Sequence, residues 1–217
     1  MYKLQLILDK IDKRILFVFY CLLSVSITYV INKAIISDQY YYEHFSNQLS
    51  IERIKDFLIY RQSWDWIGYA TKPIFLLGKI FFISLGLLVG AILYNTSIRF
   101  KKIFSIVLIA EGAFLLGGIV RLIVLWNSDF ESLVSIQSYY PLSIINFQDE
   151  IVSLNWQQYI LIQINFFHLL YLFLLSLGFK IITKTKLLKS ILYVGLPYSI
   201  ILIIWFSLVA FVAVSLN

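Results

Sequence analysis

Residues 73–94 read PIFLLGKIFFISLGLLVGAILY, a long apolar run in which Lys79 is the single charged side chain. A helix needs about 20 predominantly apolar residues to cross the hydrocarbon core of a bilayer, which is about 30 Å thick. Because that core offers no water to the peptide groups, the backbone must bond to itself, and a helix does so within one segment. The stretch therefore predicts a membrane-spanning helix.

Four further runs have similar length and character, at residues 15–36, 103–126, 156–179 and 191–214. The chain of 217 residues is 60% hydrophobic and 14% charged, whereas soluble domains are about half apolar and about a quarter charged. The first run is long and lacks a small-residue cleavage site, so it predicts an uncleaved span. We expect an all-α integral membrane protein, a five-transmembrane-helix bundle that forms a single membrane domain over residues 1–217.

Basic residues are distributed unevenly between the two sides of such a bundle. The side formed by the N-terminal segment and the loops after the second and fourth runs carries eleven Lys or Arg and two acids, a charge of +9. The opposite side carries five basic and nine acidic residues, a charge of −4. Because loops rich in Lys and Arg stay in the cytoplasm, we expect the N-terminus in the cytoplasm and the C-terminus outside. The eleven are Lys3, Lys10, Lys13, Arg14, Arg99, Lys101, Lys102, Lys180, Lys184, Lys186 and Lys189.

Two outer segments are too rich in apolar and aromatic residues for free loops. Residues 37–72 contain a predicted amphipathic helix, Ser50–Arg61, which we expect to lie on the outer face of the membrane. Its apolar side carries Ile51, Ile54, Phe57 and Leu58. Residues 127–155 are expected to fold back on the helix ends as a partly structured outer cap, re-entrant or interfacial.

Few polar side chains fall inside the runs, and Glu111 is the most unusual of them. An acid about eight residues into a span faces protein or water, and it is either functional or a neutral packing residue. His168 lies near the middle of the fourth run, and Gln158 and Asn165 fall on a similar helical face. For His168, a hydrogen bond between helices is favoured. A Glu111–His168 pair that relays a proton is the alternative.

Arg121 and Lys79 are placed near the outer ends of their runs. Their long side chains are expected to reach the interface, and the alternative is that they line a site for an anionic ligand. Small residues recur at Gly86 and Gly90, and again at Gly117 and Gly118. Such spacing lets helices approach closely. Packing within this bundle is the favoured interpretation, and homodimerisation is the alternative.

Signatures of enzymes and metal sites are missing from the sequence. There is no His-x-x-x-His pair, no Gly-x-Ser-x-Gly motif and no Walker loop. Cys21 is the single cysteine, which excludes an internal disulfide and a cysteine-based metal site. We therefore expect no catalytic residues, no cofactor and no metal. The scattered basic residues also argue against a nucleic-acid partner.

These observations favour a non-enzymatic subunit of a larger membrane complex, such as secretion, transport or envelope machinery. Its expected partners are membrane lipids and other membrane protein subunits or a second copy of the chain. Two alternatives remain: a small oligomeric pore or carrier that uses a Glu111/His168 polar path, and an intramembrane enzyme. Frequent Ile, Lys and Asn are typical of an AT-rich bacterial genome, so the expected location is a bacterial inner (cytoplasmic) membrane.

Overall fold

The computed structural model describes residues 12–148 and 156–215, and five of its helical segments are long and apolar enough to cross a membrane. The elements are α2 (Lys13–Val30), the π-helix η1 (Ile31–Ile35), α3 (Asp38–Phe45), α4 (Ile51–Leu93), α5 (Phe100–Ala110), α6 (Gly112–Asn127), α7 (Leu133–Ser138), the 3-10 helix η2 (Ile144–Phe147), α8 (Trp156–Gln163), α9 (Phe166–Thr183) and α10 (Leu187–Ser215). The predicted number of apolar helices is thus confirmed. Within the described ranges, the β-type pairing is an isolated bridge between Ser143 and Asn165.

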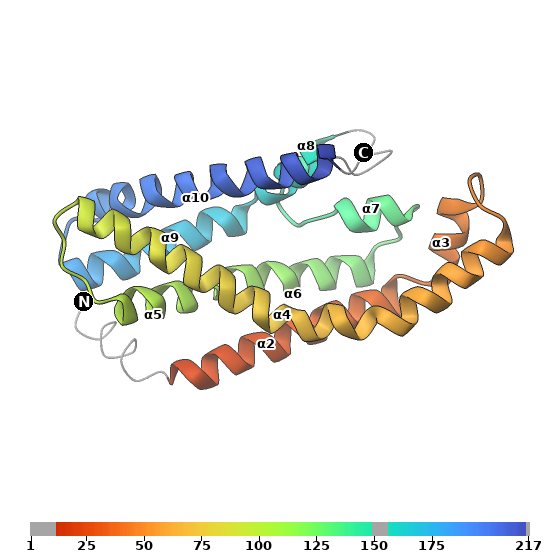
Figure 1. The fold of residues 1–217 in the computed structure, drawn as a ribbon, viewed down its shortest axis with the longest axis horizontal. Helices are drawn as coiled ribbons and strands as arrows, with labels where there is room; N and C mark the ends of the chain where they lie inside the picture. Colours follow the sequence, from red (N-terminus) through yellow and green to blue (C-terminus); the bar gives the residue numbers. More distant parts are fainter. Residues whose placement is uncertain (1–11, 149–155, 216–217) are drawn as a thin grey trace.

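The five long segments lie side by side in an elongated bundle (Figure 1). α10 packs on α9 and α4, α5 packs on α4 and α9, and α6 packs on α9 and α2. The connections α4–α5 and α9–α10 lie at the same end of the bundle, called the inner end below. The small elements α3 and α7 lie toward the opposite, outer end. A core of buried residues, including Ile80, Leu87, Ile106, Leu175 and Val194, holds the inner part together.

The second span differs most from the expectation. Residues 51–61 are helical as predicted, but they are the first turns of α4, which continues without a break to Leu93. Its 43 residues make a helix about 65 Å long, measured along its axis. Pro73 lies inside the helix and removes one backbone donor. The expected separate helix is therefore not found, because residues 51–61 continue into the span through a bend in α4 (Figure 1).

Two predicted spans are divided. The third is α5 followed directly by α6, with Glu111 as the single turn residue between them. The fourth is interrupted at Ile164 and Asn165, so the apolar helix begins at Phe166 rather than at residue 156. Asn165 is extended, with φ −140° and ψ 165°, and its side-chain oxygen accepts a hydrogen bond from the backbone N–H of His168 at 2.9 Å. Asn is a favoured helix N-cap, which explains where α9 starts.

The outer end of the bundle has its own hydrophobic core. Buried side chains from α2, α3, the first turns of α4, and α7 meet there, among them Ile27, Tyr41, Ile54, Leu58 and Ile136. The expected outer cap thus includes α7 and η2, and its residues 149–155 lie outside the described residues, as do Lys3 and Lys10 of the N-terminal segment. Of the predicted apolar side of residues 51–61, Ile54 and Leu58 are buried in this outer core, whereas Ile51 is 74% exposed.

Candidate functional site

Three of the polar residues singled out in the sequence, Lys79, Glu111 and His168, lie at a common depth. Each is roughly three to four helical turns from the inner end of its helical segment, with Lys79 in α4, Glu111 between α5 and α6, and His168 in α9. At about 1.5 Å per residue, this places each of them about 16–23 Å from the inner end. In a hydrocarbon core about 30 Å thick, this is near the middle or slightly beyond it.

Glu111 is paired with Lys79, a contact that the sequence does not predict. The Lys79 Nζ lies 2.9 Å from Oε2 of Glu111, whose side chain is 3% exposed, against 38% for Lys79. The ammonium also lies 3.7 Å from the ring centre of Phe114 and 5.4 Å from that of Tyr171. The expectation that Lys79 extends to the outer interface is thus wrong, because a carboxylate and two aromatic faces in a medium of low dielectric hold the cation inside.

His168 has a different partner. Its Nε2 lies 2.6 Å from the hydroxyl of Tyr198 on α10, and its ring meets Phe114 at 5.2 Å between centres. Tyr171, whose ring centre is 4.7 Å from Phe114 and 5.6 Å from Tyr198, completes the group. We call Lys79, Glu111, Phe114, His168, Tyr171 and Tyr198 the polar-aromatic cluster. Glu111 and His168 belong to it together but bond to different residues, and rings link them.

Nδ1 of His168 is buried without a hydrogen-bond partner among the described residues. Oε1 of Glu111 and the hydroxyl of Tyr171 are buried without a well-aligned hydrogen bond, but the two side chains interact with each other. A buried polar group without a partner is costly, and such groups mark places where a water molecule or a proton is bound. The arrangement can therefore hold a proton or a water molecule, and no described group of three or more His, Cys, Asp or Glu could hold a metal ion.

The predicted polar stripe along the fourth span does not form. Gln158 lies on α8, which ends before the break, and Asn165 uses its side chain to start α9. The Nδ2 of Asn165 donates to the carbonyl oxygens of Ile162 at 2.9 Å and Gln163 at 3.2 Å. A common helical face requires one continuous helix, so the break removes the register on which the stripe depended.

Tyr171 and Tyr198 are the members of the cluster that sequence reasoning missed. Tyr171 follows His168 by three residues, so a helical face through His168 would have included it. Tyr198 gave no comparable signal, because its position opposite His168 depends on how α10 packs against α9. Aromatic residues are frequent in this chain, at 18%, which hides the few that contact polar groups.

Arg121 turns toward the outer cap. Its Nη2 donates to the carbonyl oxygens of Ile136 at 3.0 Å and Gln137 at 3.4 Å, in the last turn of α7. The hydroxyl of Tyr140 lies nearby: burial raises the pKa of Tyr140, and the positive charge of Arg121 partly opposes that rise. Arg121 thus ties α6 to the outer cap rather than extending into the interface.

The four glycines singled out in the sequence lie at contacts between segments of this chain. A Cβ on Gly86 or Gly90 would collide with Ile201 or Pro197 of α10. A Cβ on Gly117 would lie 2.6 Å from the hydroxyl of Tyr140, and one on Gly118 would meet Ile27 of α2 at 3.5 Å. The Gly86–Gly90 face of α4 is therefore covered by α10. This geometry supports packing within the bundle over a dimer through that face.

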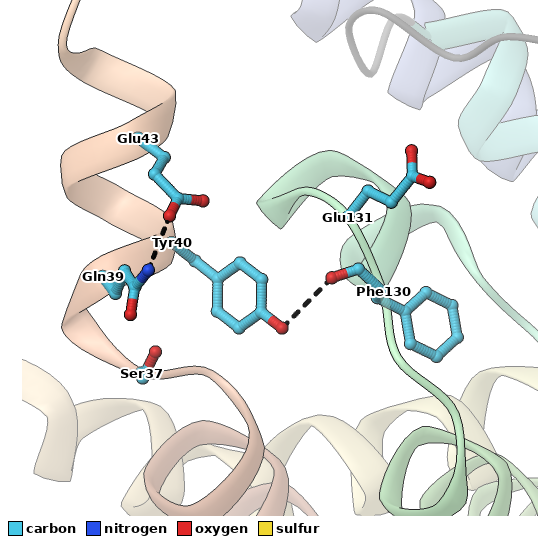
Figure 2. Close-up of a pocket in the computed structure, with 6 residues that line it drawn as sticks. All are labelled: Ser37, Gln39, Tyr40, Glu43, Phe130 and Glu131. Carbon is cyan, nitrogen blue, oxygen red and sulfur yellow. Dashed lines mark hydrogen bonds between the residues drawn. The ribbon is translucent and has the colours of Figure 1, made fainter.

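A separate pocket of about 270 Å³ lies at the outer end, between α3 and the segment that leads to α7 (Figure 2). Its lining residues are Ser37, Gln39, Tyr40, Glu43, Phe130 and Glu131. Tyr40 donates its hydroxyl hydrogen to the carbonyl oxygen of Phe130 at 3.1 Å, and Nε2 of Gln39 donates to Glu43 at 2.8 Å. The pocket is acidic, but two carboxylates on opposite sides of it do not define a ligand.

No protein-family model matches the chain, and no curated protein and no solved structure matches it at a significant level. The class of protein comes from the fold: five apolar helices indicate a multi-pass membrane protein. What that protein does must be argued from its own side chains.

Proposed function

We propose that the protein is a non-enzymatic subunit of a larger complex in a bacterial inner membrane, such as secretion, transport or envelope machinery. The observation that carries this proposal is a group of exposed large apolar side chains on the outer half of α4. Ile59, Tyr60, Trp64 and Trp66 are 51–65% exposed, and the ring centres of Tyr60 and Trp64 lie 6.1 Å apart. We call these four residues the outer α4 surface.

The position of this surface favours a protein partner over lipid. Tyr60 precedes Pro73, where the apolar run of α4 begins, by between three and four helical turns, which is about 20 Å along the helix. The headgroup layer on each side of a bilayer is only about 5–8 Å thick. The far end of the outer α4 surface would therefore extend past the headgroups, where exposed aromatic residues mark protein interaction sites.

The test is the native mass of the protein, purified at near-native expression in a mild detergent. We expect a complex for the wild type and its loss in Tyr60→Ala/Trp64→Ala. Trp205→Ala is the matched control, because Trp205 is 53% exposed on α10, an apolar helix, and should face lipid. A wild-type monomer without any associated protein contradicts the proposal, and so does equal loss of mass in the control.

The proposal includes an orientation, with the N-terminus in the cytoplasm and the C-terminus outside. It is supported by the charge difference of +9 against −4, and both of the described basic loops lie at the inner end (Figure 1). A C-terminal alkaline phosphatase fusion should be active and a fusion within residues 184–189 inactive. The reverse pattern, or activity at both sites, overturns the orientation or the number of spans.

A small oligomeric pore or carrier is the second candidate, and the buried, unpartnered Nδ1 of His168 in the polar-aromatic cluster favours it. The rings that fill the space between Glu111 and His168 count against an open water path. The test is proton flux into liposomes that contain the purified protein. A relay requires flux that Glu111→Gln abolishes while expression and assembly persist. Absence of flux in the wild type removes this candidate and leaves the subunit proposal in place.

A further inference from the structure

Two separate loops bring exposed cations to the inner end of the bundle. One is the α4–α5 connection with the first turn of α5, and the other is the α9–α10 connection with the first turn of α10 (Figure 1). We call the exposed cations of these two loops the inner basic surface. Its members are Arg99, Lys101, Lys102, Lys184, Lys186 and Lys189.

Two contacts make the loops neighbours. A Cβ on Gly178 of α9 would collide with the side chain of Ile106 of α5, so these helices touch between one and two turns from their inner ends. The rings of Tyr94 and Tyr193 are stacked, with 4.2 Å between their centres and 17° between their planes. The end of α4 therefore meets the second turn of α10. The cations of the two loops thus belong to one surface.

The chain supplies this surface with little negative charge. No Asp or Glu occurs between Asp65 and Glu111 or after Glu150, and both loops fall within these stretches. The ion pairs of the described residues lie elsewhere, and none of them includes a member of the inner basic surface. The described acid at this end is Asp12, whose carboxylate caps α2 through the backbone N–H of Arg14 at 2.9 Å. Cations gathered in this way attract anions from outside the protein.

The α9–α10 loop is held in place by hydroxyl groups. The hydroxyl of Thr185 lies 2.8 Å from that of Thr183 and 2.8 Å from that of Ser190. Lys184 and Lys186, on either side of Thr185, are exposed. The two ammonium groups therefore extend from a backbone that is already fixed, which reduces the entropy lost when an anion binds.

Apolar side chains beside the cations indicate that the anion is a lipid. Leu93, at the end of α4, is 76% exposed, and Leu188, between Lys186 and Lys189, is 72% exposed. Exposed leucines at the ends of membrane helices face acyl chains, and long basic side chains beside them extend to the headgroups. A soluble anion would leave these leucines uncovered. An anionic phospholipid matches both the charge and the apolar contact.

We propose that the inner basic surface binds the headgroups of anionic phospholipids in preference to zwitterionic ones. Its ammonium and guanidinium groups pair with the phosphate oxygens, and the acyl chains cover the neighbouring leucines. In the proposed orientation, these lipids belong to the cytoplasmic leaflet. The surface itself depends neither on that orientation nor on the subunit proposal.

The experiment measures which lipids the full-length protein retains. The protein in a neutral detergent receives equal amounts of phosphatidylglycerol and phosphatidylcholine with identical acyl chains, and native mass spectrometry counts the bound molecules of each. We expect an excess of phosphatidylglycerol of about fivefold or more, because one Lys or Arg near an anionic headgroup is worth about that factor. Equal retention of the two lipids overturns the proposal and leaves an acidic protein partner as the counter-charge.

Variants test whether the inner basic surface is responsible. The triple variant Lys184→Gln/Lys186→Gln/Lys189→Gln should lose most of the excess. The control Arg53→Gln/Lys55→Gln removes exposed cations from the first turns of α4, at the outer end, and should keep it. An unchanged excess in the triple variant, or an equal loss in the control, contradicts the proposal.

A second measurement on the wild type serves where the triple variant fails to fold. Raising the concentration of ammonium acetate from about 0.05 M to about 0.5 M screens exposed charges. The excess of phosphatidylglycerol should then fall severalfold, while the retention of phosphatidylcholine stays the same. An excess that does not change with salt overturns the proposal, because it would not arise from exposed cations.

Discussion

The two halves of α4 hold their paired charges in different surroundings. In the inner half, Pro73–Leu93, the single charge is Lys79, and it is held by a carboxylate that is 3% exposed. In the outer half, Ile51–Lys72, Asp65 bonds to Lys33 at 3.0 Å, and the Lys33 side chain is 42% exposed. The acid of the inner pair is thus the more buried, at 3% exposed against 16% for Asp65, while the two lysines are similarly exposed, at 38% and 42%.

The difference shows that the surroundings, rather than the residue types, set the importance of an ion pair. Where water is excluded, a charge without its partner cannot be solvated, so loss of either partner is costly. Where water reaches one partner, it replaces most of what the pair contributes. A contrast in packing also exists along α4, since Gly86 and Gly90 lie against α10, whereas Gly68 and Gly78 have open space beside them.

The largest effect should come from breaking the buried pair. Glu111→Leu leaves the Lys79 ammonium without its carboxylate, and we expect it to lower the free energy of unfolding by about 3 kcal/mol. Lys79→Met should do similar damage, and the double variant should recover more than half of the loss because no charge is left unpaired. Denaturant unfolding in detergent micelles measures all three. A double variant as unstable as the sum of the single variants shows that the two residues do not act as a pair.

A smaller effect is expected from the glycines. Gly90→Ala places a Cβ against Pro197 and should destabilise the protein by about 1–3 kcal/mol through overpacking. Gly68→Ala, in the outer half of the same helix, has no atom within 4 Å of the new Cβ and should stabilise by about 0.5–1 kcal/mol. Thermal unfolding of the two variants side by side distinguishes them. Equal behaviour would mean that α10 does not pack on the inner half as described.

The smallest effect should come from the solvated pair. Lys33→Met removes the partner of Asp65, but Arg61 remains 3.9 Å away from the same carboxylate. We expect a change below about 1 kcal/mol, measured under the same conditions as the Lys79 variant. A loss as large as that of Lys79→Met would place the outer half of α4 in surroundings as dry as those of the inner half.

The apolar helices could be predicted from the sequence because their signal is local. An uncharged run of about 20 residues has few alternatives to a membrane helix, and the first span, predicted at residues 15–36, is found at Lys13–Ile35. The start of α9 also had a local signal in Asn165, a good N-cap, but the apolar residues on both sides concealed it.

The contacts of the site could not be predicted in the same way. Lys79 and Glu111 are 32 residues apart, and their pairing depends on which helices are neighbours and how each is rotated. Glu111 stands out in the sequence by its depth alone, whereas Lys72 counts there only as a charge of an outer loop. The hydrogen bond from Lys72 to Thr28 of α2 could be recognised only in the structure, where α4 is continuous and carries the Lys72 side chain against α2.

The break before Phe166 also affects the bilayer. Lys180 lies in the last turn of α9, so the uncharged part of that helix spans only about 21 Å, against about 30 Å of hydrocarbon. Its neighbour α10 has an apolar stretch of 26 residues. A short span is accommodated by local thinning of the lipid and by a lysine that extends to the headgroups. We therefore expect the two leaflets to approach each other beside α9, where lipids with shorter acyl chains should fit better.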